Sequence, residues 1–188
     1  MYSEDIKNAL YHLKRGDIIL YPTDTIWGIG CDATKNNVVE KIFKIKNRAE
    51  TKSFIVLVDS FQMLKQYVKH VPDIAEELLK GFGTPVTVIY SNARKLAANV
   101  IAPDNTVAIR IINDDFCNPL IKKFGKPIVS TSANISGQST PLVFSHIDQT
   151  IIDEVDYVVG CKRDLFVSIK PSTIIRLRDD GSYVIIRR

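Results

Sequence analysis

The chain has 188 residues, 45% of them hydrophobic, and its 25 lysines and arginines against 21 aspartates and glutamates give a formal net charge of +4. This composition predicts a single domain over residues 1–188 with one buried core, and the mild positive excess suits phosphate-bearing ligands but excludes a histone-like basic tail. Three scattered cysteines and three histidines predict neither disulfides nor a zinc site, and without a signal pattern or long apolar run we expect a cytoplasmic protein with no membrane segment.

Apolar periodicity predicts helices and strands in loose alternation. The predicted helices cover residues 3–15, 36–45, 59–68, 72–79, 114–124 and 141–152, with Asn36 or Asn37 capping the second and a break near Pro119 in the fifth. The predicted strands cover residues 17–21, 54–58, 84–90, 105–112, 126–129, 156–159, 174–177 and 183–188. A turn at residues 179–182 joins the last two strands into a hairpin. This order favours an α/β fold with a mixed sheet.

A polar turn and two glycines follow the first predicted strand. Pro22 stops strand pairing, and residues 23–25 form a turn rich in hydroxyl groups. Gly28 and Gly30 would let a flat ligand or another stretch of backbone pass close to the chain. We interpret Trp27, which lies between the turn and the glycines, as an anchor in the core rather than as a stacking platform.

Three cations lie between the second helix and the strand that follows it. Lys46, Arg48 and Lys52 must crowd at one end of the sheet, because the apolar strand begins at residue 54. One interpretation is a solvated helix end whose cations are favoured by the helix dipole. The other is a clamp in which these cations converge on the phosphates of a nucleotide. These residues alone leave both interpretations open.

Arg110 lies inside the otherwise apolar strand at residues 105–112. A buried guanidinium needs an anionic partner, because an unpaired one would cost several kcal/mol. The partner is either a carboxylate of the protein or a carboxylate of a ligand, and the sequence does not decide between them.

Residues 130–137 follow a short apolar strand and combine small hydroxyl side chains, an asparagine and a glycine. This composition is typical either of an ordinary turn or of a loop that binds anionic oxygens through hydroxyl and backbone N–H groups. In an open α/β sheet the end of a strand is where ligands bind. The sequence contains neither of the known glycine-rich phosphate motifs, so neither of those loops binds phosphate here.

Four parts of the chain together resemble the YrdC-type threonylcarbamoyl-AMP synthases. These parts are residues 21–33, residues 46–53, residues 130–137, and residues 171–173 with 185–187. Their order and spacing match over nearly the whole chain, and its length is similar to that of the short bacterial form. The resemblance implies a twisted mixed sheet flanked by helices, with a large, concave, positively charged cavity.

The resemblance also implies an activity. Such an enzyme joins L-threonine, bicarbonate or carbon dioxide, and ATP into threonylcarbamoyl-adenylate and pyrophosphate. Mg²⁺ would accompany the ATP, with phosphate oxygens and water as its main ligands. The product would pass to a partner complex that modifies adenosine beside the anticodon of some tRNAs, and weak contact between this chain and tRNA is compatible with its charge.

Individual residues receive implied roles from the same resemblance. The residues implied to contact ATP are Arg48, Lys52, Thr106, Ser132, Asn134, Thr140 and Arg187. The residues implied to hold L-threonine are Thr25, Arg110, Ser130 and Ser172, with Arg110 taking the carboxylate. Lys46, Arg48 and Lys52 form the implied catalytic group of cations. The chain departs from the family pattern at residues 82–87, at Ile112 and at Leu57.

Two other functions remain to be distinguished. The first is a carbamoyl-adenylate-forming domain like that of the hydrogenase-maturation carbamoyltransferases, which are long multidomain chains. The second is a non-catalytic RNA-binding module, although the cations here are not interleaved with aromatic residues as they are on single-strand platforms. Turnover of ATP that depends on threonine would separate the main interpretation from both.

Overall fold

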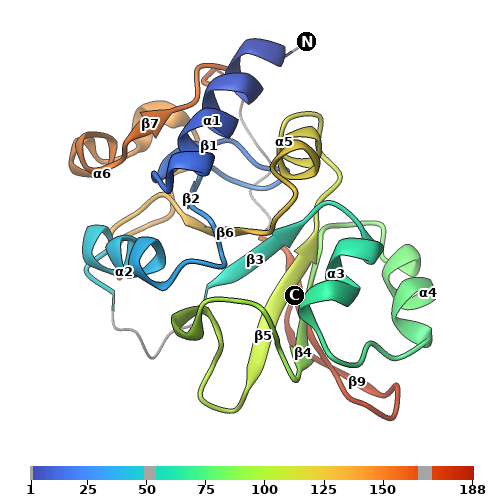
Figure 1. Cartoon of the computed structure of the whole chain (residues 1–188). Helices are drawn as coiled ribbons and strands as arrows, with labels where there is room; N and C mark the ends of the chain where they lie inside the picture. Colours follow the sequence, from blue (N-terminus) through green and yellow to red (C-terminus); the bar gives the residue numbers. More distant parts are fainter. Residues whose placement is uncertain (1, 49–53, 165–170) are drawn as a thin grey trace.

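The computed structural model describes residues 2–48, 54–164 and 171–188. Over these residues the chain forms one twisted, mixed sheet of nine strands in the order β7-β1-β2-β6-β3-β5-β4-β8-β9 (Figure 1). The strands are β1 (Ile19–Tyr21), β2 (Gly28–Gly30), β3 (Ile55–Val58), β4 (Val86–Ser91), β5 (Thr106–Ile111), β6 (Ile128–Ser132), β7 (Tyr157–Val158), β8 (Thr173–Leu177) and β9 (Tyr183–Arg187). The α/β fold with a mixed sheet and a closing hairpin is therefore confirmed.

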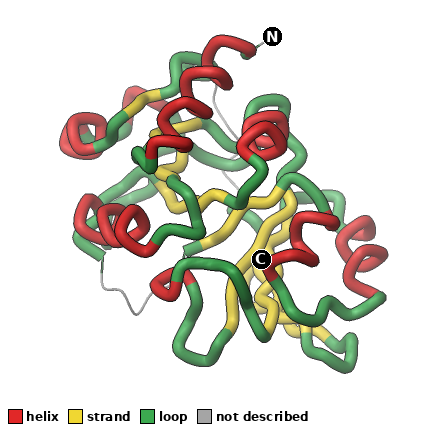
Figure 2. The backbone as a smooth tube through the Cα atoms, in the orientation of Figure 1, coloured by secondary structure: helices red, strands yellow, loops and turns green. Residues whose placement is uncertain are grey.

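Six α-helices surround this sheet in the described part of the chain (Figure 2). They are α1 (Ser3–Arg15), α2 (Asn36–Ile45), α3 (Phe61–Tyr67), α4 (Ile74–Gly81), α5 (Cys117–Phe124) and α6 (Gln149–Glu154). Helix α1 packs against α5 and β1, while α3 and α5 pack against β3. The buried face of α1 carries Ile6, Ala9 and Leu13, and the helix ends at Gly16, whose φ of 83° is the left-handed conformation expected of a C-terminal glycine.

Three expected helix features differ in the structure. Lys35 is the N-cap of α2, and Asn36 instead uses its Oδ1 to accept a hydrogen bond from the backbone N–H of Ala98 at 2.6 Å. Pro119 does not break α5, because it lies in the first turn, where a missing N–H costs no helical hydrogen bond. The helix expected at residues 141–152 is wrong in its first half: a short 3₁₀ turn precedes α6 there.

Strand β2 was not expected, because a Gly-Ile-Gly sequence has low β propensity. It pairs antiparallel with β1 on one side and with β6 on the other. A Cβ atom on Gly30 would overlap the Val129 carbonyl oxygen and come within 2.7 Å of Tyr21 Cε1, so the glycine permits a close approach of backbone. Trp27 is fully buried and packs on Phe144 with ring centroids 4.9 Å apart, as expected of a core anchor.

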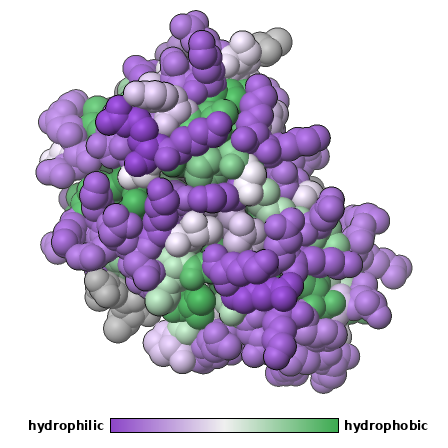
Figure 3. Space-filling view, viewed as in Figure 1, coloured by the Kyte–Doolittle hydropathy of each residue, from purple (hydrophilic) through white to green (hydrophobic). Residues whose placement is uncertain are grey.

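The face of the molecule seen in Figure 3 is mostly hydrophilic, with small apolar areas between polar side chains. Within residues 2–48, 54–164 and 171–188, no helix combines the length and the apolar character needed to cross a bilayer.

Candidate active site

A cavity of about 420 Å³ lies beside the strands at the centre of the sheet. Its volume falls in the range of small-molecule sites. Residues far apart in sequence meet in its wall. The predicted site residues that line it are Thr25, Arg48, Arg110, Ser130, Ser132, Thr140, Ser172 and Arg187. The charged groups in its described lining are three arginines, Arg48, Arg110 and Arg187. The structure thus brings Arg48, which follows α2, to one cavity with the hydroxyl side chains of Ser130 and Ser132, which lie at the end of β6 rather than in a loop after the strand.

Strand register explains this meeting. Gly28 pairs with Ser132 between β2 and β6, which places the polar turn next to the hydroxyl loop. Ile55 of β3 pairs both with Ser130 of β6 and with Ala108 of β5. Arg110 lies two residues further along β5, on the same face as Ala108. The cavity therefore lies over β2, β6, β3 and β5.

The polar turn is held by its own hydroxyl groups. Thr23 Oγ1 accepts hydrogen bonds from the N–H groups of Thr25 and Ile26 at 3.1 and 3.2 Å and donates to the Ile26 carbonyl at 2.7 Å. Thr25 Oγ1 accepts a long hydrogen bond of 3.4 Å from the Arg110 guanidinium. Both threonines are buried, so the turn presents a preorganised hydroxyl group to the cavity.

Arg110 has a protein carboxylate as its neighbour. Its Nη2 lies 3.1 Å from Asp24 Oδ1, and the two side chains are 5% and 17% exposed. The two charges attract, yet Asp24 Oδ1 and Arg110 Nε have no hydrogen-bond partner, because the groups are close without being aligned. Burial raises the pKa of Asp24, and Arg110 opposes that rise. Asp24 is therefore the protein carboxylate that pairs with Arg110, a partner that the sequence did not decide. Because Arg110 also lines the cavity, part of its guanidinium stays available to a ligand.

Lys46 lies behind the wall of the cavity. It is 1% exposed, and its ammonium donates to the carbonyl oxygens of Ser132 and Asn134 at 2.5 Å each. The backbone N–H of Ser136 also donates to the Lys46 carbonyl at 2.9 Å. Lys46 thus ties the end of α2 to the hydroxyl loop, a placement that differs from the expected one beside the phosphates. Its catalytic role stays a prediction.

The Asn134 side chain shapes the same loop. Its Oδ1 accepts from Ser132 Oγ at 2.5 Å, and its Nδ2 donates to the carbonyl oxygens of Ile135 and Gln138. These bonds close the loop on itself and leave its hydroxyl edge toward the cavity. They are the contacts expected of a residue that braces the loop.

We expect the Lys46→Met substitution, which keeps the length but removes the ammonium, to lower the free energy of unfolding by about 2–3 kcal/mol at pH 7, since buried carbonyls lose their donor. Burial, with repulsion from Arg48, lowers the pKa of Lys46 from 10.5 to about 8. Between those values the unfolded chain binds more protons, so the native protein gains stability as pH rises. The loss caused by the substitution should therefore grow by about 2 kcal/mol between pH 7 and 9.5.

Urea unfolding of both proteins at the two pH values measures this difference. Lys44→Met is the control, because Lys44 is an exposed residue of α2 that pairs with Glu40 at 2.7 Å. A loss at Lys46 that shrinks with rising pH would contradict the assignment.

Arg48, which follows α2, and Arg187, at the end of β9, reach the cavity from distant parts of the chain. The Arg48 guanidinium lies over the ring of Phe54, 5.1 Å from its centroid, and Arg187 Nη2 donates to the Ser172 carbonyl at 3.0 Å. Burial lowers the pKa of both arginines, and for Arg187 the charge of Arg110 adds to this effect. Such clustered cations favour an anionic ligand.

Besides Asn134, which braces the loop without lining the cavity, two predicted ATP residues are not part of this cavity as described. Thr106 lies at the start of β5, where its hydroxyl donates to Asp104 at 2.6 Å and lines a separate hollow of about 360 Å³. Lys52 lies outside the described residues. The roles of both stay predictions.

Several lining residues were not singled out from the sequence. Thr23, Thr131 and Phe54 all contribute to the wall. Thr23 and Thr131 belong to the two polar segments that drew attention, so their position could have been found from the motifs. Phe54 reads from sequence only as the first residue of an apolar strand. Among the described residues, no group of three histidine, cysteine or acidic side chains could hold a metal ion.

Comparison with known proteins places this cavity in a family. The model of the Sua5/YciO/YrdC family, described as "Telomere recombination", matches residues 11–188. The chain is 32% identical over 172 residues to a threonylcarbamoyl-AMP synthase of Pseudoalteromonas translucida (strain TAC 125), covering 90% of this chain and 91% of that protein. It is 33% identical over 162 residues to a protein of the same name from Vibrio cholerae serotype O1, covering 85% and 86%.

Among solved structures, P. abyssi Sua5 complexed with L-threonine superposes with a TM-score of 0.84 at 28% identity. The match covers 97% of this chain and 53% of that one, so the chain spans about half the length of this structure. The matched family model covers nearly all of the sequence, including the segments that line the cavity. The chain belongs to the Sua5/YciO/YrdC family.

Proposed function

We propose that this protein is an L-threonylcarbamoyladenylate synthase of the cytoplasm. It forms threonylcarbamoyl-AMP and pyrophosphate from L-threonine, bicarbonate or carbon dioxide, and ATP. The proposal rests on one observation: three arginines and two hydroxyl-rich segments line the same cavity. Relatives of the chain are named threonylcarbamoyl-AMP synthases. The proposal also includes a single domain over residues 1–188. The product passes to a downstream complex that modifies tRNA, and this chain contacts tRNA weakly.

In this proposal the triphosphate lies against the cationic side of the cavity. Arg48 and Arg187 offset the phosphate charge, with Lys52 beside them and Lys46 holding the loop. Thr140 donates a hydroxyl hydrogen bond, Ser132 lines the nucleotide side while its own hydrogen is held by Asn134, Asn134 braces the loop, and Thr106 contacts the nucleotide from its own hollow. Mg²⁺ bound to ATP would have phosphate oxygens and water as its main ligands, and it would supply positive charge that offsets the charge of pyrophosphate.

L-threonine lies at the other side of the cavity. Arg110 binds its carboxylate, while Thr25, Ser130 and Ser172 contribute hydroxyl groups. Ser172 Oγ already shares a 2.8 Å hydrogen bond with Thr87 Oγ1, which orients it. The residues that hold the two substrates share one wall, so the amino acid and the α-phosphate are brought together.

The chemistry follows from this placement. The threonine amine attacks carbon dioxide to form a carbamate, and a carbamate oxygen then attacks the α-phosphorus of ATP and displaces pyrophosphate. Transfer at phosphorus depends mainly on positioning and on cations that offset developing charge. Two fixed arginines and a preorganised hydroxyl loop supply both requirements.

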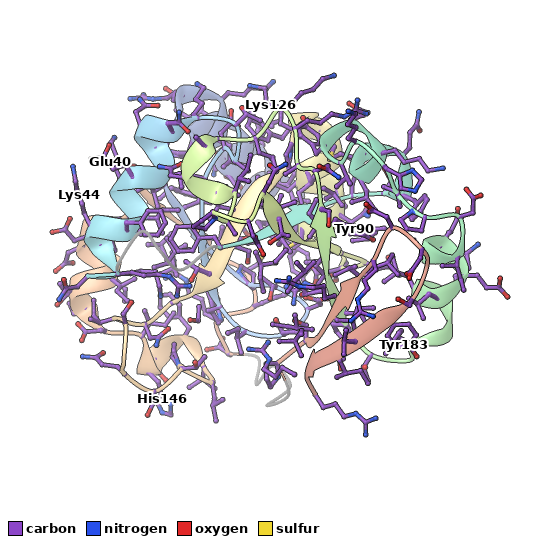
Figure 4. All side chains as sticks on the ribbon, turned by 90° about the horizontal axis from the view of Figure 1, so that it is seen from below. Glu40, Lys44, Tyr90, Lys126, His146 and Tyr183 are labelled. Carbon is purple, nitrogen blue, oxygen red and sulfur yellow. The ribbon has the colours of Figure 1, made fainter. Side chains whose placement is uncertain are left out.

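The Arg48→Ala substitution should lower kcat/KM for ATP roughly tenfold to a hundredfold, because one charge-assisted phosphate contact is worth about 1.5–3 kcal/mol. Lys44→Ala is the control: Lys44 lies on the adjacent helix, and it points with Glu40 away from the body of the molecule (Figure 4). Steady-state pyrophosphate release measures both. Full activity of Arg48→Ala would remove this residue from the phosphate site.

The function itself is tested by mass spectrometry of the product made from ATP, bicarbonate and a panel of amino acids, with carbamoyl phosphate as a separate substrate. Among the amino acids of the panel, only threonine should give a carbamoyl-adenylate product, with the mass of threonylcarbamoyl-AMP. A product formed from carbamoyl phosphate would favour the hydrogenase-maturation type of domain. RNA binding that weakens steeply with salt, without any ATP turnover, would favour the non-catalytic module.

A further inference from the structure

Asp24 is a carboxylate next to Arg110, outside the described lining of the cavity, and it has no role in the proposed function. It lies between two threonines that shape the polar turn, and it approaches the Arg110 guanidinium to 3.1 Å. Its side chain is 17% exposed, and it lines a hollow of about 520 Å³ that shares Thr25 and Pro171 with the main cavity. The carboxylate therefore borders a hollow that adjoins the site.

An amino acid that enters this site carries two charges. Its carboxylate matches Arg110, but its ammonium group would face a wall whose charged groups, among the described lining residues, are arginines. An ammonium group taken from water without an acceptor costs several kcal/mol. Asp24 lies 3.1 Å from Arg110, the group assigned to the ligand's carboxylate, so it is a candidate acceptor for the ammonium group.

Asp114 is the other carboxylate whose charge acts on Asp24, and it is already paired, while Arg188 lines the same hollow as Asp24. Asp114, from the segment before α5, pairs with Lys162 at 2.7 Å and accepts hydrogen bonds from the N–H groups of Phe116 and Cys117. Asp24 Oδ1, by contrast, has no hydrogen-bond partner although it is buried. Burial also raises the pKa of Asp24, which makes it a better proton acceptor than an exposed aspartate.

We propose that Asp24 is a further catalytic residue, which binds the α-ammonium of L-threonine and accepts a proton from its nitrogen when the carbamate forms. The inference rests on the proposed function. The ammonium first loses one proton to water. The nitrogen lone pair then forms the N–C bond with carbon dioxide, a C=O electron pair moves onto oxygen, and the remaining acidic N–H proton passes to Asp24. The carboxylic acid later returns that proton to water.

Equilibrium binding separates ammonium recognition from a merely structural ion pair. The probes are L-threonine and (2S,3R)-2,3-dihydroxybutanoate, which keeps the carboxylate, the β-hydroxyl and the methyl group but carries a hydroxyl in place of the ammonium. We expect the wild-type protein to bind threonine at least tenfold more tightly than the analogue. In Asp24→Asn that preference should fall to within about twofold, mostly through weaker threonine binding, and Asp24→Glu should restore part of it.

Asp32→Asn is the matched control, because Asp32 is also a buried carboxylate in an ion pair, with Lys126 at 3.1 Å, and it lines neither the cavity nor the adjoining hollow that Asp24 lines. It should keep the preference for threonine. Equal weakening of both ligands by Asp24→Asn would mean that Asp24 only holds Arg110, and it would overturn the proposal. If Asp24→Asn fails to fold, the wild-type protein decides: equal affinity for the two ligands overturns the proposal, and a preference of tenfold or more supports it.

The proton step has its own measurement. At saturating threonine, kcat of Asp24→Asn should fall at least tenfold, whereas an unchanged kcat would remove Asp24 from the proton transfer. Absence of threonylcarbamoyl-AMP from the wild-type reaction would refute the proposed function instead. Because the binding preference is measured without turnover, the two failures are distinguishable.

Discussion

The Arg110→Ala substitution is expected to raise the KM for L-threonine by about 100-fold while changing the KM for ATP by less than about fivefold. The buried guanidinium is the cation next to the hydroxyl groups assigned to the amino acid, and a charge-assisted contact in a desolvated site is worth about 1.5–3 kcal/mol. Its 5% exposure means that water cannot replace it. Initial-rate kinetics with each substrate varied in turn measure the split, and equal increases in both KM values would contradict the assignment.

The same substitution should also reduce stability by about 3 kcal/mol, because Asp24 would remain buried without its cation. The double variant Arg110→Ala, Asp24→Asn should regain much of that stability while still failing to bind threonine. Arg15→Ala is the control. Arg15 pairs with Asp17 at 3.3 Å but is 59% exposed, so its removal should leave the stability nearly unchanged. Thermal unfolding of the four proteins provides the comparison.

The Gly30→Ala substitution is expected to destabilise the protein by about 3 kcal/mol or more, at the upper end of the range for overpacking. The added methyl group would overlap the Val129 carbonyl oxygen and come within 2.7 Å of Tyr21 Cε1. Backbone cannot move aside as a flexible side chain can, so β1, β2 and β6 would have to separate. Activity should fall with stability, because β2 and β6 carry two walls of the cavity.

Gly83→Ala is the matched control for Gly30. Nothing lies within 4 Å of a Cβ atom built at Gly83, so the substitution should change the free energy of unfolding by less than about 0.5 kcal/mol. Chemical denaturation of both variants measures the difference. A Gly30→Ala protein as stable as the wild type would show that β2 does not approach β6 as closely as described.

Local patterns predicted most of the elements, because most of them have one apolar face and a clear ending. Helix α1 shows this, with its buried stripe and Gly16 at its end. Strand β2 escaped prediction, since its pairing depends on a close approach of backbone that two glycines permit, and no local pattern reports that. The region before α6 was misjudged because its apolar residues pack against the core, as Phe144 does on Trp27, without forming a continuous helix.

The membership of the candidate site was predicted better than its internal contacts. Motifs identified residues such as Ser130 and Arg110, because polar groups at the ends of apolar strands have few structural uses. The partners of charged residues depend on which side chains lie close together in the folded structure, and the local sequence does not report those distances. For Arg110 the sequence therefore left open whether the partner is a protein carboxylate or a ligand carboxylate, and the structure shows Asp24. Lys46 was expected beside the phosphates, whereas in the structure its ammonium donates to the carbonyl oxygens of Ser132 and Asn134.

The pairing of β2 with β6 and of β4 with β8 joins segments separated by about half the chain. During synthesis on a ribosome, the wall that contains Arg187 cannot form until β8 and β9 have emerged, so a growing chain exposes the apolar strands of its sheet before it can bind any substrate. Long-range pairings of this kind slow folding and prolong the exposure of unpaired edges. A bound nucleotide or amino acid would therefore stabilise only the completed sheet, because the full cavity does not exist before then.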